Sequence, residues 1–255
     1  MIVKVLGAHN CETQGTRLTS FLIDNILAID AGSLTSSLPL SEQLKIEALL
    51  VTHQHYDHIR DIPSLAMNFN LHKKTIHVYS SQAVHEILTE CLLNGRVYPK
   101  FMSEPEENPT INFPTVDAYQ TFDTCGYSVL TARSNHSVLT LGYQITSEDG
   151  KSVFYTGDTG VDLEYWQHLS PDLLITEVIA SNRYESFARE KGHLTPSLIE
   201  QELKIFRETN NYLPRVTLVH IYPDLEEEIR DEIDKVSRLL GHPIDLAYEG
   251  MQIEV

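Results

Sequence analysis

The chain has 255 residues, with 19 Lys and Arg against 36 Asp and Glu, a formal net charge of −17 and 42% hydrophobic residues. This composition is typical of a globular protein, and the excess of acid argues against a long nucleic acid as partner, because such binding depends on Lys and Arg. No stretch approaches the roughly 18 consecutive apolar residues of a membrane span, and the opening MIVKVLGAHN lacks the apolar region of a secretory signal. We therefore expect a cytoplasmic protein that does not associate with a membrane.

Short runs of β-forming residues recur along the chain, and helical patterns separate many of the later ones. We expect strands at Ile2–Leu6, Phe21–Asp24, Ile26–Asp30, Ala48–Thr52, Ile76–Ser80, Val116–Tyr119, Ser128–Ala132, Leu141–Thr146, Ser152–Thr156, Leu173–Glu177, Val216–His220 and Met251–Val255. Apolar residues at i, i+3 and i+4 predict helices at Ser81–Leu93, Thr195–Glu208 and Pro223–Leu240. An antiparallel start followed by alternating strands and helices predicts a mixed α and β class, with two helix-covered sheets.

No break in composition divides the chain, so residues 1–255 are expected to form a single domain. The segment Tyr98–Pro114, with four prolines and an acidic cluster, is expected to be irregular, as a lid or as a surface crossing. Cys11, Cys91 and Cys125 are widely spaced and odd in number. They predict neither a disulfide framework nor a cysteine zinc site, which suits a reducing compartment.

The sequence HQHYDH at residues 53–58 follows the apolar run Ala48–Val51 and Thr52, and four of its six side chains can bind a metal ion. Alternate residues of an extended segment point to the same side. His53 and His55 can therefore bind one ion, while Asp57 and His58, past the turn, address another. The alternative interpretation is a set of polar residues on a surface loop.

Further candidate ligands stand at the ends of other expected strands. His136 follows Ser128–Ala132, Asp158 follows the next strand but one in YTGDTG, and His220 closes TLVH. Gly157 and Gly160 beside Asp158 permit tight turning and close approach. For each of these polar residues, taken singly, the alternative to metal binding is a structural role.

The run HQHYDH, then His136, then FYTGDTG and then His220, in this order over almost the whole chain, resembles the metallo-β-lactamase superfamily of αββα metallohydrolases. The resemblance implies an α+β fold in which two mixed β-sheets are flanked by helices. It also implies two groups of metal ligands that share one bridging carboxylate: His53, His55 and His136 on one metal, Asp57, His58 and His220 on the second, and Asp158 on both. Position 55 is His, whereas the di-iron flavoprotein branch usually carries Glu there, which argues against redox chemistry.

The stretch TEVIASNRYESFAREKGHLTP places Glu177 at a strand end and His193 sixteen positions later. It resembles the segment of ribonuclease Z and related phosphodiesterases in which a Glu–His pair serves proton transfer. On this likeness His193 would protonate the leaving alkoxide and Glu177 would orient its imidazole; with Asp57 they are the catalytic candidates. The alternative is that His193 only caps the helix that begins near Thr195, the expected N-cap, with Pro196 as its first residue.

The spacing between His136 and Asp158, 158 − 136 = 22 positions, leaves no room for the tRNA-gripping arm that ribonuclease Z inserts there. The resemblance therefore favours a small phosphodiester, and within it the class II cyclic nucleotide phosphodiesterases acting on 3′,5′-cyclic AMP or GMP. It implies two divalent ions, zinc first and manganese or iron as alternatives, that share the attacking hydroxide. The implied partners are the small substrate and, by analogy with the superfamily, a second copy in a homodimer.

Three other functions stay open. The same metals could serve a ribonuclease Z-like or other small nuclease, or a hydrolase of a lactam, lactone or thioester, although carbonyl hydrolases generally lack the Glu–His pair. The chain could also be a silent scaffold, against which the complete ligand set argues.

Among other residues, His9 and Asn10 follow the first strand and are candidates to line the pocket, and Arg183, Arg189 and Lys191 either meet substrate phosphate or lie on the surface.

Overall fold

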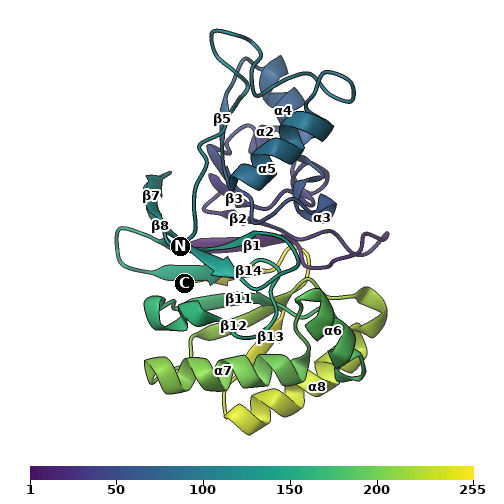
Figure 1. The fold of residues 1–255 in the computed structure, drawn as a ribbon, viewed down its shortest axis with the longest axis vertical. Coiled ribbons are helices and arrows are strands. Elements are labelled where there is room, and N and C mark those ends of the chain that lie inside the picture. The colour runs from purple at the N-terminus through teal and green to yellow at the C-terminus, as the bar shows by residue number, and fades with distance from the viewer.

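The computed structural model describes the backbone of residues 1–255 and every side chain except those of Glu164 and Tyr165. Two seven-stranded sheets pack face to face, and helices cover the outer face of each sheet (Figure 1). The expected αββα sandwich of two mixed sheets is confirmed. Among the described residues, no helix has the length and apolar character needed to cross a membrane.

The first sheet is antiparallel on one side and parallel on the other. Its strands in spatial order are β14 (Gln252–Glu254), β1 (Ile2–Gly7), β2 (Ser20–Ile23), β3 (Leu27–Ile29), β4 (Ala48–Leu50), β5 (Ile76–Tyr79) and β6 (Ile111–Asn112). The second sheet is parallel from β13 to β10 and antiparallel from β10 to β7. Its strands in spatial order are β13 (Ile244–Leu246), β12 (Arg215–Val219), β11 (Leu173–Glu177), β10 (Ser152–Tyr155), β9 (Thr140–Thr146), β8 (Tyr127–Ser134) and β7 (Thr121–Thr124).

The helices fall into two sets, one for each sheet. The first set comprises α1 (Leu34–Ser37), α2 (Leu40–Gln43), α3 (Tyr56–Ile59), α4 (Ile62–Leu71), α5 (Gln82–Ile87) and the π-helical turn η1 (Leu88–Leu92). The second set comprises α6 (Glu185–Lys191), α7 (Pro196–Asn210), α8 (Glu226–Leu240) and the 3₁₀ turns η2 (Glu164–His168), η3 (Asn182–Tyr184) and η4 (Pro223–Leu225).

Three apolar layers hold these elements together. Side chains such as Val5, Phe21 and Tyr143 fill the space between the two sheets. A second layer lies between the first sheet and its helices, and a third lies between the second sheet and α7 and α8. The predicted inner face of α7 belongs to this third layer, since Leu198 and Phe206 are buried. Burial on both faces explains why the central strands read as continuous apolar runs.

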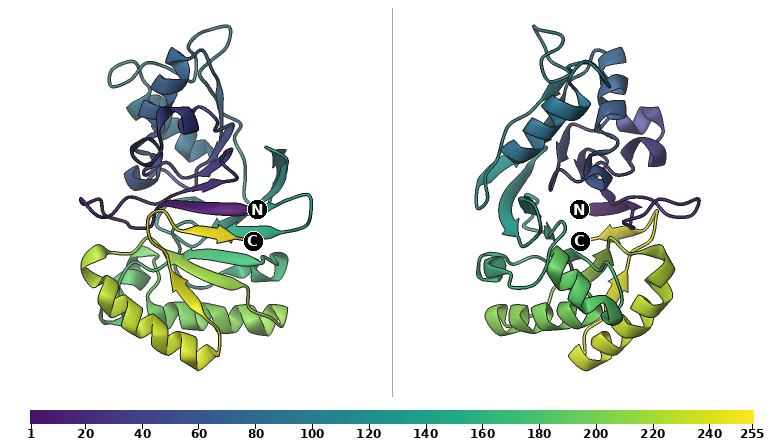
Figure 2. Two further views of the ribbon diagram at one scale, coloured as in Figure 1. Left: turned by 180° about the vertical axis from the view of Figure 1, so that it is seen from behind. Right: turned by 45° about the vertical axis from the view of Figure 1, so that its right-hand side comes forward.

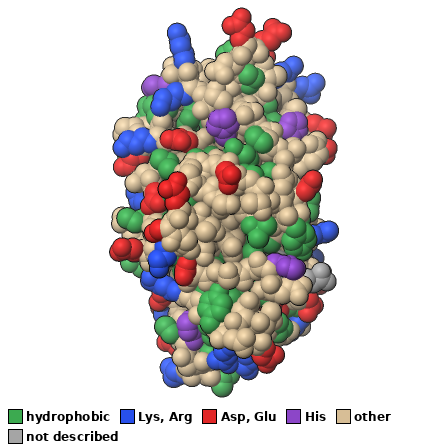
Figure 3. Space-filling view, turned by 90° about the vertical axis from the view of Figure 1, so that its left-hand side faces the viewer, with side chains coloured by type: hydrophobic (Ala, Val, Ile, Leu, Met, Phe, Trp, Pro, Cys, Tyr) green, Lys and Arg blue, Asp and Glu red, His purple; other side chains and the backbone are tan. Residues whose placement is uncertain are grey.

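The carboxyl ends of six strands meet at one edge of the sandwich. In the first sheet β3 and β4 run parallel, and in the second β10, β11 and β12 run parallel while β8 has the same direction as β10. In such sheets ligands bind outside the carboxyl ends of strands. In Figure 1 this edge lies on the side of α3 and α6, and Figure 2 shows β1 and β14 side by side from two further directions. The opposite side, seen in Figure 3, carries interspersed acidic and basic side chains.

Most expected strands are present, and one is wrong. Residues 116–119 form no strand, because Tyr119 adopts a left-handed conformation (φ 65°) in a turn that precedes β7. The short strands β6, β7 and β13 and the helices α1, α2, α3, α4 and α6 were not predicted from the sequence. Thr195 does occupy the N-cap of α7, but its side chain makes no capping hydrogen bond and pairs with the hydroxyl of Ser197 instead.

Candidate metal centre

Three histidines converge where β4 and β8 end. His53 and His55 lie in the extended segment after β4, and His136 lies in the loop between β8 and β9. Nδ1 of His55 is 3.0 Å from Nε2 of His53 and 3.2 Å from Nε2 of His136. Imidazole nitrogens are common metal ligands, and three of them gathered this closely form a donor set that suits a metal ion.

A second group forms beside the first. Asp57 and His58 lie in the first turn of α3, and His220 follows β12 with a left-handed backbone (φ 60°) that a non-glycine residue rarely adopts. The carboxylate of Asp57 lies 3.1 Å from Nε2 of His220 and 3.4 Å from Nε2 of His58. The structure thus places Asp57, His58 and His220 together, as the resemblance implied.

Asp158 stands between the two groups. One of its oxygens is 3.3 Å from Nε2 of His58, and the other is 3.7 Å from Nε2 of His53 and 3.5 Å from Nε2 of His220. Nε2 of His58 and Oδ1 of Asp158 are buried, and neither has a hydrogen-bond partner among the described residues. Buried polar atoms without partners are costly, and a bound cation would satisfy both. The donor set of imidazoles and carboxylates therefore fits two divalent ions.

Hydrogen bonds behind the ligands fix which ring nitrogen faces the centre. Nδ1 of His136 lies 2.9 Å from the carbonyl of Gly192, and Nδ1 of His58 lies 2.7 Å from a carboxylate oxygen of Asp30. Each Nδ1–H donates to its acceptor, so Nε2 is the nitrogen that faces the centre and binds a metal once it is unprotonated. Asp30 also accepts hydrogen bonds from the backbone and hydroxyl of Thr52, so it joins β3 to the HQHYDH loop.

Two glycines make room for these contacts. Gly157 has φ 64°, and a Cβ there would lie 3.0 Å from side-chain atoms of Thr52 and Thr140. Gly192 has φ 73°, and a Cβ there would lie 2.9 Å from Cα of His136. The tight turning that the sequence indicates beside Asp158 is therefore present, and Gly192 ends α6 where its carbonyl meets His136.

The charges of the two groups differ. Burial and the neighbouring imidazoles hold the pKa of His53 well below its ordinary value, and burial likewise lowers the pKa of His55 and His136. Burial also acts to lower the pKa of His58 and His220, but the carboxylates of Asp158 and Asp57 outweigh it and raise both.

The Glu–His pair lies beside this centre. Nδ1–H of His193 donates to Oε1 of Glu177 across 2.7 Å, and the His193 ring lies 4.8 Å from that of His136 and stacks at 5.7 Å on that of His220. Glu177 is itself fixed, because it accepts hydrogen bonds from the backbone of Thr159 and Leu194. Burial lowers the pKa of His193, but the nearby Glu177 carboxylate outweighs it and raises the pKa to about 9.

A cavity of about 560 Å³ opens over the centre, and its lining includes Asn10, Tyr56, Asp57, Arg60, His193 and His220. Asn10 thus occupies the predicted place. His9 does not: it is buried between Glu249 and Glu226. No residue of Tyr98–Pro114 is among the described residues lining this cavity, and the segment instead packs Phe101 into the core and contains the short strand β6.

The cavity wall contains a cation, Arg60, that no sequence pattern indicated. Arg60 follows α3 and pairs with Glu12 and Asp61. The three cations considered from the sequence lie outside the lining and are engaged on the surface: Arg183 with Glu228, Arg189 with Glu185 and Lys191 with Glu190. Asp30 was missed as well, although an Asp that ends a buried strand is the signal that drew attention to Asp158.

Comparison with protein families matches residues 19–221 to the family described as "Beta-lactamase superfamily domain". Among curated proteins, a ribonuclease Z of Pyrococcus abyssi (strain GE5 / Orsay) is 28% identical over 113 residues, which are 44% of this chain. That match spans about a third of the relative's length (34%).

Solved structures share the fold over the whole chain. Yeast PDE1, solved without a ligand, has a TM-score of 0.85 at 13% identity, with 100% of this chain and 99% of that chain covered. Zn²⁺-bound PqqB from Methylobacterium extorquens has a TM-score of 0.70 at 15% identity, with 100% of both chains covered. At such identities these likenesses establish the fold alone.

Proposed function

Because this chain belongs to the beta-lactamase superfamily, whose members with this fold are metal-dependent hydrolases, we propose that it is a phosphodiesterase with two divalent metal ions. The proposed substrate is a small phosphodiester, and the preferred candidate is a 3′,5′-cyclic nucleotide. The single observation that carries the proposal is the hydrogen-bonded pair of Glu177 and His193 beside the ligand cluster. A phosphodiester needs a proton donor for its alkoxide leaving group, and this pair supplies one.

The two ligand groups would hold the metals, with zinc favoured by the imidazole and carboxylate donors and manganese or iron as alternatives. Bound there, the ions supply an activated water at neutral pH and offset the charge that develops on the phosphate. His53, His55 and His136 form one group, and Asp57, His58 and His220 form the other, with Asp158 between them.

The chain's own residues position the remaining chemistry. Glu177 holds the His193 imidazole by its Nδ1–H, so Nε2 is the atom available to give a proton to the leaving oxygen. The pKa of His193, raised to about 9, keeps the imidazole protonated at neutral pH in the resting protein. Burial of the Glu177 side chain, only 1% exposed, prevents water from competing for this hydrogen bond.

A hydrolysis assay on two kinds of leaving group tests the proposal. The protein is loaded separately with Zn²⁺ and Mn²⁺ and assayed on bis(p-nitrophenyl) phosphate and on 3′,5′-cyclic AMP and GMP, with a chelator-treated sample as control. His193→Ala is expected to lower turnover of the cyclic nucleotides about a hundredfold or more, because their leaving group needs an acid. It should affect the activated nitrophenyl ester far less. Absence of turnover with both metals demonstrably bound would refute the phosphodiesterase proposal, and lactones and thioesters would be tested next.

A ribonuclease Z-like or other small nuclease is the second candidate, favoured by the 28% identity to ribonuclease Z. Against it, residues 147–151 form the whole connection between β9 and β10, so this region carries no inserted arm. Cleavage of a precursor tRNA at its 3′ side, with no turnover of cyclic nucleotides, would decide for this candidate.

A further inference from the structure

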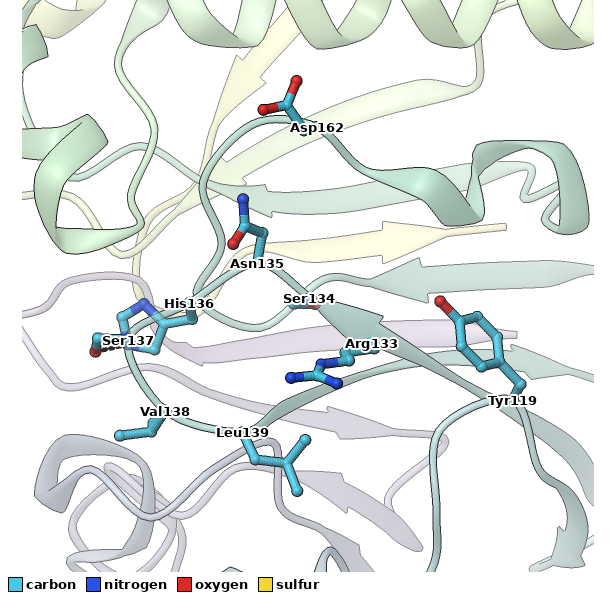
Figure 4. A pocket seen from close by; sticks show the side chains of 9 residues that line it. All are labelled: Tyr119, Arg133, Ser134, Asn135, His136, Ser137, Val138, Leu139 and Asp162. Atoms are coloured by element: carbon cyan, nitrogen blue, oxygen red, sulfur yellow. Dashed lines mark hydrogen bonds between the residues drawn. The ribbon is translucent and has the colours of Figure 1, made fainter.

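A second cavity of about 500 Å³ lies alongside the loop that carries His136 (Figure 4). Its lining includes Tyr119, Arg133, Asn135, Ser137, Leu139 and Asp162. None of these six side chains has a place in the metal centre or in the Glu177–His193 pair. His136 also lines the cavity and belongs to the centre, so the six other side chains add chemistry beside the centre that the centre itself does not use.

The cavity begins at the metal centre itself. Ser137 lies in its wall, and the Ser137 hydroxyl is 3.4 Å from Nε2 of His136, the nitrogen that faces His55. From there the lining continues back along β8 to Arg133, near the end of the strand. His136 lines this cavity and His55, 3.2 Å away, lines the cavity over the centre, so the two cavities lie on either side of this pair of histidines.

Arg133 supplies an unneutralised positive charge. Its side chain is exposed and forms no ion pair or hydrogen bond with any described residue. Asp162 lines the same cavity, but in Figure 4 Asn135 lies between the two side chains, and Asn135 is tied by its amide to the carbonyl of Val161. In a protein with a net charge of −17, an unpaired arginine beside the centre creates a local site for an anion.

Tyr119 is held in place at the far end. Its backbone has φ 65°, and its N–H donates to the carbonyl of Thr131 across 3.0 Å. The Thr131 hydroxyl fixes the same turn, since it donates to the carbonyl of Asp117 and accepts from the backbone of Gln120. The surrounding hydrogen bonds keep this uncommon backbone conformation in place, and the residue is 53% exposed. An exposed aromatic ring on a backbone held in this way is suited to stacking on a nucleobase.

We propose that this cavity is a subsite for a nucleotide that carries a second phosphate, with the phosphate on Arg133 and the base against Tyr119. The guanidinium can bind a phosphate through two parallel hydrogen bonds, which gives geometric selectivity as well as affinity. Asp162, on the other side of Asn135, repels a phosphate and so directs it to Arg133. This inference rests on the proposed function for its account of turnover, and it names the substrate class as phosphodiesters with a second, terminal phosphate.

The experiment compares two substrates that differ by one phosphate: thymidine 5′-(p-nitrophenyl phosphate) and its 3′-phosphorylated derivative. The ratio of their kcat/KM values is expected to favour the 3′-phosphorylated substrate by tenfold or more. Arg133→Gln should abolish this preference, and Arg133→Lys should restore part of it. The matched control is Arg215→Gln, which removes the same charge at the opposite end of the second sheet and should leave the ratio unchanged. Tyr119→Ala should lower kcat/KM for both nucleotides about fivefold or more, and Tyr119→Phe should not.

Binding without turnover separates this inference from the proposed function. Calorimetry measures the affinity of the metal-loaded protein for thymidine 3′,5′-bisphosphate and for thymidine 5′-monophosphate. Tenfold tighter binding of the bisphosphate, lost in Arg133→Gln, supports the subsite even if neither ester is hydrolysed. Equal affinities in the wild type, or a preference that Arg133→Gln leaves intact, would overturn the subsite while leaving the phosphodiesterase proposal standing.

Discussion

The two ligand groups share Asp158 but surround their histidines in opposite ways. His53, His55 and His136 face one another, and burial together with neighbouring imidazoles lowers their pKa. His58 and His220 instead face the carboxylates of Asp57 and Asp158, which raise their pKa. A metal binds only the unprotonated nitrogen. The first group is therefore already in its metal-binding form, whereas the second must give up protons to bind.

For the proposed pair of metal ions, this difference predicts two sites of unequal character. The three-histidine group is expected to bind its ion over a wide pH range. The second group is expected to bind with an affinity that depends on pH and on the groups that orient its ligands. The proposed phosphodiesterase activity needs both ions, so its limits are set by the second group.

The largest effect is expected from Asp158→Ala, because this carboxylate contacts both groups. Its removal should lower turnover of bis(p-nitrophenyl) phosphate at least about a thousandfold, equivalent to about 4 kcal/mol of activation free energy. Metal analysis should show fewer than two ions per chain. Full metal content with unchanged turnover would mean that Asp158 does not link the groups.

Asp30→Asn tests the second group most directly, because Asp30 contacts His58 itself but reaches the first group only through Thr52, whose hydroxyl lies 3.0 Å from Nδ1 of His53. The variant loses the charge that accepts the Nδ1–H of His58, and metal affinity is expected to fall about ten- to a hundredfold. Competition with a chromophoric chelator should assign most of the loss to one of two ions. Equal weakening of both ions would contradict the assignment of Asp30 to one group. Thr35→Ala is the matched control. Only the backbone N–H of Thr35 contacts an aspartate at this edge, and that aspartate is Asp61.

Lowering the pH should release the metals in sequence. The raised pKa of His58 and His220 means that protons compete with the second ion first, with up to about a tenfold loss of affinity per pH unit for each displaced proton. Titration of the loaded protein, followed by dialysis and metal analysis, should pass through a state with one ion per chain. Simultaneous loss of both ions would argue against the distinction.

His9 provides a comparison without a metal. Like the second group it faces carboxylates, with Nδ1 2.7 Å from Glu249 and Nε2 3.3 Å from Glu226. Burial lowers the pKa of His9, but Glu249 outweighs it and the net pKa is raised; burial raises the pKa of Glu249, but His9 outweighs it and the net pKa is lowered. His9→Gln is expected to reduce the free energy of unfolding by about 1 to 3 kcal/mol, from the loss of charge-assisted hydrogen bonds.

The pH dependence of that loss follows from the two shifts. The contribution of a histidine with a raised pKa is complete below its ordinary value of 6.5 and disappears as the pH rises through the raised value. The contribution of Glu249 is complete above 4.5 and disappears as the pH falls through the lowered value. Urea unfolding should therefore show the largest difference between wild type and His9→Gln from about pH 4.5 to 6.5. A difference that grows at alkaline pH would contradict the ion pair.

The convergence of the candidate ligands was predictable because each of them follows a buried apolar strand, where a polar residue stands out. Asp30 carries the same signal in AIDAG, but its role depends on contact with His58, which lies 58 − 30 = 28 positions away in the chain. No local pattern shows such a partner. The strand expected at Val116–Tyr119 failed for a related reason, because the Thr131 hydroxyl captures the turn around Tyr119 and overrides a local β preference.

Arg133 and Arg60 show the same limit. Nothing in the sequence separates these two arginines from Arg183 or Arg189, which pair with surface carboxylates. Only the folded arrangement shows that Arg60 lines one cavity and Arg133 another. The roles of these side chains in turnover stay predictions, as do those of His193 and Glu177.

Each ligand group combines residues from both sheets, and this bears on the order of events during synthesis. His53, His55, Asp57 and His58 leave the ribosome early, with the first sheet, whereas the second group is closed by His220, which is 220 − 58 = 162 positions after His58. Until residue 220 has been made, the nascent chain can offer a metal only an incomplete second group. Metal capture at that position would then add the last ligand link between the two sheets, after the first group, which already joins them through His136.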